Sequence, residues 1–191
     1  MGAIQTNSAS VFYLQISDGK ICRRVQSPTE SSVPRTTKDG RTVYEEWFGG
    51  WEGKITGIET RDSDYGKEWR IIIQDGAEKA ILSMKYSSGY AASFLKTLPN
   101  VDLSKSVKLI PKLTIEGEKK RTALFISQDG KALKWYYSKE TPNGIPLLKK
   151  VKIKGVETWD DSDMMEFLEE MVNTKILPQL SGIDSGGDMP F

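Results

Sequence analysis

Cations and aromatic rings recur at alternate positions of several segments that have the pattern of β-strands. Because successive residues of a strand point to opposite faces, one face of each segment is apolar and the other carries charges and rings. Cations neutralise phosphates, and an exposed ring can stack on a base for ~1–3 kcal/mol. The pattern therefore predicts contact with single-stranded nucleic acid. The residues expected on this outward face are Arg70, Lys108, Lys112, Arg121, Phe125, Lys134 and Tyr136.

The opposite face of the same segments is expected to form the core. Large rings elsewhere, including Trp47, Phe48 and Trp51, are more typical of a core than of a stacking surface. A plain alternative for the outward lysines is a solvated sheet face that protects against aggregation. The residues expected to point inward are Trp69, Ile71, Ile73, Val107, Leu109, Leu113, Ile115, Leu124, Ile126, Trp135 and Tyr137.

Residue types that are missing restrict the chemistry further. The chain has no histidine and one cysteine, Cys22. Histidine is the commonest general base near neutral pH and the commonest metal ligand, so Ser-His-Asp, Cys-His and His-metal sites are excluded. Cys22 is expected to be a small buried side chain. We therefore expect no enzyme activity, no cofactor and no metal, although carboxylate-bound Mg²⁺ stays open.

Charge divides unevenly along the chain, which carries a net +1. Residues 1–154 contain 26 Lys and Arg against 17 Asp and Glu, whereas residues 155–191 contain 1 against 9. A body of +9 joined to a tail of −8 suggests that the body meets a polyanion and that the tail meets something basic, including the body itself. The alternative is that the tail only aids solubility.

The order of elements follows from hydrophobic periodicity and turn residues. Residues 11–25 predict a β-hairpin, and 26–41 a long loop. Residues 43–76 predict two long strands, with a bend at Gly57 because Ile55 and Ile58 lie three positions apart. A third strand (78–86), a short helix (88–100) and strands at 106–117, 121–128 and 131–138 follow. The basic run 147–155 is expected to form an edge strand or to extend the phosphate track.

Three strands, a helix and two further strands are the order of the five-stranded OB barrel. The stretch "GKITGIETRDSDYGKEWRIIIQDG" resembles the first hairpin of OB-fold nucleic-acid-binding domains, and a likeness of pattern extends over 43–138. It implies a mainly β fold in which an N-terminal β-hairpin precedes a five-stranded OB barrel, with one helix between strands three and four and a C-terminal helix. The groove would be rimmed by loop 61–66, with Tyr65, and loop 116–120, with Lys119 and Lys120.

The C-terminal region predicts a helix that ends at Pro178. Met164, Phe167, Leu168, Met171 and Val172 share one face of it, and Asp163 and Glu166 have capping-box spacing. Capping is preferred to metal binding for Asp160, Asp161 and Asp163, because acids at a helix N-terminus are favoured by the macrodipole. The apolar face could dock on the barrel or pair with a second copy. The expected units are therefore 1–42 (hairpin and loop), 43–155 (OB domain), 156–180 (helix) and 181–191 (acidic tail).

The last residues, "GIDSGGDMPF", combine a Gly/Ser spacer, acids and a final Pro-Phe. They resemble the acidic tail tip of bacterial and phage single-stranded DNA-binding proteins, and phage-encoded versions are the nearer likeness. The resemblance implies a protein of DNA replication, recombination or repair, whose tail recruits partners such as DNA polymerase, primase or helicase. The residues implied in partner binding are Asp184, Asp188, Met189, Pro190 and Phe191.

The expectation is therefore a single-stranded DNA-binding protein. An RNA-binding OB protein and a phage accessory protein that binds only proteins remain alternatives. No apolar run approaches the ~20 residues needed to cross a bilayer, and the N-terminus lacks the pattern of a secretory signal, so a cytoplasmic location is expected. Oligomerisation stays open.

Overall fold

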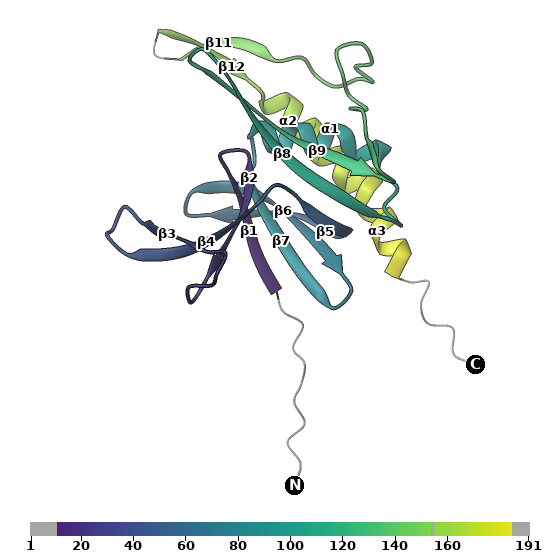
Figure 1. The fold of residues 1–191 in the computed structure, drawn as a ribbon. Helices are drawn as coiled ribbons and strands as arrows, with labels where there is room; N and C mark the ends of the chain where they lie inside the picture. Colours follow the sequence, from purple (N-terminus) through teal and green to yellow (C-terminus); the bar gives the residue numbers. More distant parts are fainter. Residues whose placement is uncertain (1–10, 154, 185–191) are drawn as a thin grey trace, which may run out of the picture.

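The structure is a computed structural model, and it describes residues 11–153 and 155–184. Most of the regular structure is β, in one ten-stranded sheet and a separate two-stranded sheet (Figure 1). The strands are β1 (Val11–Ser17), β2 (Lys20–Val25), β3 (Val33–Thr36), β4 (Thr42–Phe48), β5 (Trp51–Ser63), β6 (Gly66–Asp75), β7 (Glu78–Lys85), β8 (Ser106–Glu116), β9 (Lys119–Gln128), β10 (Lys131–Ala132), β11 (Lys149–Ile153) and β12 (Val156–Asp160). The helices are α1 (Gly89–Thr97), the 3₁₀ turn η1 (Leu98–Asn100), α2 (Ser162–Met171), the π-helical turn η2 (Val172–Ile176) and α3 (Leu177–Asp184). The prediction of a mainly β protein is confirmed.

The strand order in the large sheet is β10-β9-β8-β5-β6-β7-β1-β2-β4-β3. All neighbours are antiparallel except β1 and β7, which run parallel. The expected closed barrel of five strands is therefore wrong, because the sheet is open and has ten strands. The edge of β7 that would have to pair in a closed barrel is taken by β1, which comes from the N-terminal hairpin. That hairpin thus belongs to the same sheet as β5–β9.

The turn between β1 and β2 also packs against the far part of the sheet. Gly19 has φ +74°, and its N–H donates to the Tyr90 hydroxyl at 3.1 Å. A Cβ at this position would lie 2.8 Å from the backbone nitrogen of Leu113 in β8. Only glycine fits this close approach with a left-handed backbone. The sheet is thereby held in a curled shape.

The core lies inside this curl. Trp69, Ile71 and Ile73 on β6 are almost fully buried, as their alternation predicts. The register between β5 and β6 shifts between Ile55 and Gly57, which confirms the predicted bulge. A Cβ on Gly57 would lie 2.8 Å from Ile72 Cδ1, so the bend depends on the absence of a side chain there.

The C-terminal helical segment covers one side of the body. The expected apolar face packs inward, with Met164 and Leu168 buried and Phe167 edge-on to Tyr137 at 5.5 Å between centroids. This settles the predicted alternatives in favour of docking within the chain. Glu169 fixes the docking from the polar side by accepting hydrogen bonds from Lys67 Nζ at 2.7 Å and from Tyr86 Oη at 2.6 Å.

Several element boundaries differ from expectation. The helix does not end at Pro178, because η2 realigns the chain and Pro178 becomes the second residue of α3, where its missing N–H costs little. The predicted capping box is wrong, since the helix begins at Ser162 and Asp160 accepts from its N–H at 3.0 Å. Asp163 pairs instead with Lys149.

The sheet also departs from the expected strands. The long strand expected from residue 43 is divided into β4 and β5, and the loop 26–41 contains β3. The strand expected at 131–138 is regular only over the two residues of β10. The basic run 147–155 contributes β11, which pairs with β12 outside the main sheet.

Two side chains expected in the core are exposed instead. Ile115 lies near the end of β8, beyond the covered part of the sheet, and is 61% exposed. Trp135 follows β10, where the alternation that should have turned it inward no longer applies, and it is 41% exposed. Its neighbour Tyr137 is buried as expected. Among the described residues no helix is both long and apolar enough to span a membrane.

Candidate nucleic-acid interface

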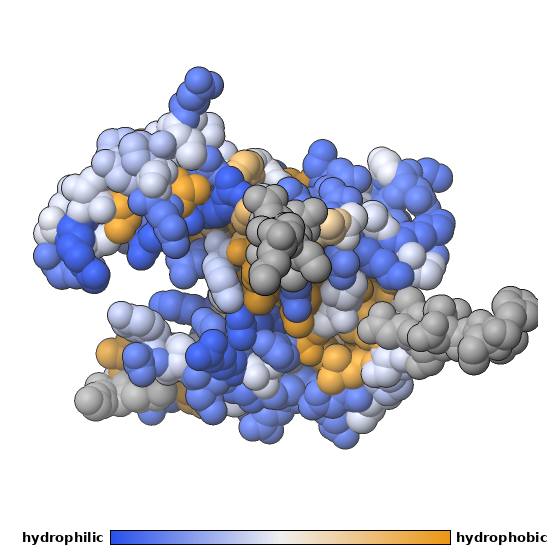
Figure 2. Space-filling model, turned by 90° about the horizontal axis from the view of Figure 1, so that it is seen from below, coloured by the Kyte–Doolittle hydropathy of each residue, from blue (hydrophilic) through white to orange (hydrophobic). Residues whose placement is uncertain are grey.

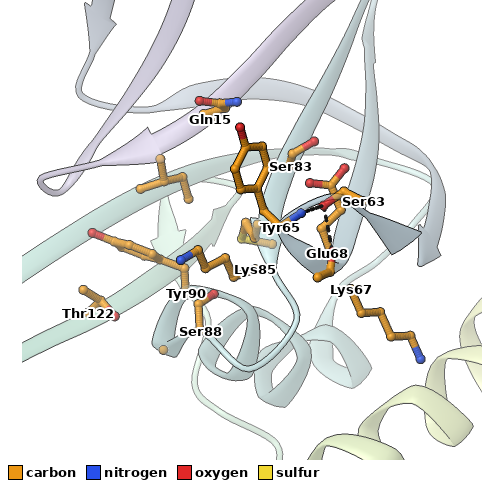
Figure 3. Close-up of a pocket in the computed structure, with 14 residues that line it drawn as sticks. Gln15, Ser63, Tyr65, Lys67, Glu68, Ser83, Lys85, Ser88, Tyr90 and Thr122 are labelled. Atoms are coloured by element: carbon orange, nitrogen blue, oxygen red, sulfur yellow. Dashed lines mark hydrogen bonds between the residues drawn. The ribbon is translucent and has the colours of Figure 1, made fainter. Parts of the chain in front are cut away.

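A cleft of about 520 Å³ lies where β1, β6 and β7 meet the start of α1. The turn from β5 to β6 lines one side of it, and Tyr90 and Thr122 line the other (Figure 3). Helix α1 begins here because the Ser88 side chain accepts from the Ala91 N–H, and Gly89 lets α1 approach Thr122 closely. The surface seen from below in Figure 2 is mainly hydrophilic, with apolar residues gathered in separate patches.

Tyr65 is the most exposed ring at this cleft. It sits in a two-residue turn in which Ser63 Oγ donates to the Gly66 carbonyl at 2.7 Å and accepts from the Tyr65 N–H at 3.3 Å. The side chain is 93% exposed and points toward Gln15 in Figure 3. The backbone of the turn is thus fixed, while no ring in the described part of the chain stacks on Tyr65. Such a ring is available to a planar ligand.

The two lysines at the cleft differ in their partners. Lys85, at the end of β7, is exposed, and it makes no ion pair with any other residue that the structure describes. Figure 3 shows it pointing toward Tyr90. Lys67 points the other way, toward the C-terminal helix, where it pairs with Glu169. Burial alone would raise the pKa of Glu169, but hydrogen bonds from Lys67 and Tyr86 lower it overall.

A row of polar side chains forms the floor of the cleft. Gln15 on β1 lies opposite Ser83 on β7, and Glu68 on β6 lies opposite Lys85, two residues farther along β7 than Ser83. The same three residues also line a second cleft of about 310 Å³, which extends to Tyr13 and Arg24. The two clefts therefore form one groove across β6, β7, β1 and β2, which we call the β6–β7 groove.

Tyr13 gives the groove a second exposed ring. It lies opposite Ile81 on β7 and is 64% exposed. Arg24 lines the same cleft, and its guanidinium forms an ion pair with the Glu45 carboxylate at 4.0 Å. The groove thus has exposed rings toward both ends and a polar floor between them.

Most of the cations predicted from the sequence lie on another surface. Lys108, Lys112 and Phe125 share the outer face of the β8–β9 hairpin, with Phe125 opposite Ile110 and 37% exposed. At the hairpin's end Lys119, Lys120 and Arg121 are exposed, and Arg121 pairs with Glu116 at 3.3 Å. The structure therefore brings these residues together on one hairpin, separately from Tyr65.

The remaining predicted contacts are dispersed. Arg70 lies on β6 opposite Ser83, but its guanidinium pairs with Glu59 at 3.0 Å. Lys134 and Tyr136 follow β10 in irregular chain, and the Tyr136 ring packs edge-on against Tyr137 at 4.9 Å. The predicted tail residues Asp188, Met189, Pro190 and Phe191 lie outside the described residues, and Asp184 is the last residue of α3.

The sequence reasoning missed Tyr13, Gln15, Glu68, Lys85 and Tyr90. Tyr13 and Gln15 alternate with the buried Leu14, a signal that was available once the hairpin was assigned to the sheet. Lys85 and Glu68 alternate with Met84 and Trp69 in the same way.

No group of three or more Cys, Asp or Glu side chains within 11–153 and 155–184 is arranged to hold a metal ion. Cys22 is buried, and desolvation raises its pKa to about 11, so the thiol stays protonated at neutral pH.

Comparisons with protein-family models, with curated proteins and with solved structures found no match to this chain.

Proposed function

We propose that the protein binds and coats single-stranded DNA, without reading a defined sequence, during replication, recombination or repair. The observation that carries the proposal is Tyr65, a ring 93% exposed on a fixed turn beside Lys85, which makes no ion pair with another described residue. Stacking on such a ring tolerates any base, and a nearby cation adds the salt-dependent phosphate term.

The position of the groove supports the same function. OB folds bind oligonucleotides on the face of their second and third strands, between the loops that join strands one to two and four to five. Strands β5, β6, β7, β8 and β9 follow the OB chain order, with α1 between β7 and β8. The β6–β7 groove and the β5–β6 turn then occupy the ligand face of an OB-like arrangement, with β1 as an additional strand.

The cations of the β8–β9 hairpin would enlarge the proposed DNA-binding surface. Lys108 and Lys112 are exposed and are not in an ion pair with any described residue. A strand of DNA longer than the groove would find further phosphate contacts there, and Phe125 offers another stacking surface. The tail would recruit replication or repair proteins through its acidic residues and Phe191.

The test is a fluorescence-anisotropy titration of labelled oligo-dT with the full chain at several salt concentrations. We expect binding that weakens linearly in log–log form with salt, as phosphate contacts require. Competition with oligo-rU of equal length separates DNA from RNA preference. An absence of binding to either polymer at low salt would refute the proposal and leave a role in protein binding alone.

A further inference from the structure

The three polar side chains on the floor of the β6–β7 groove have no partners within the described parts of the chain. Gln15, Ser83 and Glu68 come from three neighbouring strands, and neither a hydrogen bond nor an ion pair joins any of their side chains to another described residue. The other carboxylates of this sheet that are not exposed are held: Glu45 accepts from Arg35 at 2.6 Å and Glu46 from Arg23 at 2.9 Å. Carboxylates that lack a described partner elsewhere in the sheet, such as Glu52 and Glu78, are exposed, so the half-buried Glu68 is an exception among the described residues of the sheet.

Of these three side chains, Glu68 is the least able to hydrogen-bond to different kinds of ligand group. Its side chain is half-buried and lines both clefts of the groove. An ionised carboxylate only accepts hydrogen bonds, whereas the Gln15 amide and the Ser83 hydroxyl can donate or accept. No carboxylate oxygen of Glu68 is both buried and unpartnered, so water hydrates it in the free protein; a ligand that brings an N–H group can replace this water by donating to the carboxylate, whereas one that brings an oxygen cannot.

The position of Tyr65 indicates which part of a ligand would meet Glu68. Figure 3 shows the Tyr65 ring on the same side of the cleft as Gln15, Ser83 and Glu68. A base stacked on this ring would present its edge to the polar floor. Cytosine carries an N4 amino donor where thymine carries the O4 acceptor, and carboxylates accept from cytosine N4.

We propose that Glu68 gives the groove a base preference, for cytosine over thymine and uracil, through a hydrogen bond from the exocyclic amino group. Gln15 and Ser83 adapt to either base. This inference rests on the proposed function, since it concerns the same groove. It adds a residue that selects among bases to a surface that otherwise accepts any single strand.

The test compares the affinities of oligo-dC and oligo-dT of equal length for the full chain and for Glu68→Gln. A hydrogen bond to a charged group corresponds to about tenfold in affinity or somewhat more, so we expect about tenfold tighter binding of oligo-dC. In Glu68→Gln the ratio should fall to near one, because an amide can also donate to thymine O4.

Glu170→Gln is the matched control, since Glu170 is an exposed glutamate on α2 without a described ion pair. It removes the same charge and should keep the tenfold ratio, while binding of both oligomers changes equally. A ratio near one in the unmodified protein, or one that Glu68→Gln leaves unchanged, overturns the base preference alone. If neither oligomer binds, both the proposed function and this inference are refuted. Circular dichroism checks that each variant is folded.

Discussion

Replacing Tyr65 by alanine separates binding from folding more cleanly than any other change in the groove. The ring is 93% exposed, and its turn is held by Ser63 and Gly66 through hydrogen bonds that do not involve the ring. Removing it therefore takes almost no packing from the protein. We expect the free energy of unfolding to change by no more than ~0.5 kcal/mol, as for other surface substitutions.

The effect on DNA binding should be much larger. One ring stacks on one base, and such contacts contribute ~1–3 kcal/mol by alanine substitution. Because 1.4 kcal/mol corresponds to a factor of ten, the dissociation constant for oligo-dT should rise by about 5- to 150-fold. Phenylalanine keeps the stacking surface, so Tyr65→Phe should bind within about twofold of the unmodified protein.

Anisotropy titrations at constant salt measure the affinities, and urea unfolding of the same samples measures stability. The matched control is Trp159→Ala, which removes a ring that is 60% exposed on β12, away from the groove. It should leave the affinity for a short oligonucleotide unchanged. A Tyr65→Ala protein that is fully folded and binds within twofold of the unmodified chain would refute the assignment of the groove.

Three further outcomes test other parts of the structure. Lys85→Ala should lower the slope of log K against log salt by about 0.7, the value for one phosphate contact on a single strand, whereas Lys139→Ala in the loop after β10 should not change it. Hydrogen bonds from Arg35 hold the pKa of Glu45 below its usual value, so the stability they add is present above about pH 4.3 and is lost as pH falls through the lower folded-state pKa. Urea unfolding at pH 7 and pH 3 should therefore differ less in Glu45→Gln than in the unmodified chain, and an equal difference would contradict this. Deleting 185–191 leaves every described element in place and should tighten oligo-dT binding at low salt, whereas unchanged affinity would refute competition between tail and groove.

Local patterns of sequence predicted local structure well. The alternation around Ile71 is sufficient to place Trp69 in the core, and the three-residue spacing of Ile55 and Ile58 revealed the bulge at Gly57. The apolar face of the C-terminal helix was equally clear, since Leu168 is fully buried. These features depend on residues a few positions apart, and their periodicity is visible in the sequence.

Long-range pairing could not be predicted in the same way. Nothing near Leu14 indicates that its strand runs parallel to β7, because parallel partners are joined by long connections and share no turn. The groove was only partly anticipated for this reason. Tyr65 could be found from its turn, but Gln15 becomes a neighbour of Ser83 only once β1 is placed in the sheet.

The pairing of β1 with β7 has a consequence for how the chain folds. Val11 lies opposite Lys79, so this contact closes a loop of about 70 residues, and long-range β pairing of this kind is slow. The β5–β6–β7 meander, with its two tight turns, can form earlier. During synthesis β1 leaves the ribosome before β7, so it cannot pair with β7 until about 70 further residues have been made. A fragment limited to 43–155 would leave the β7 edge unpaired, and unpaired edges promote aggregation.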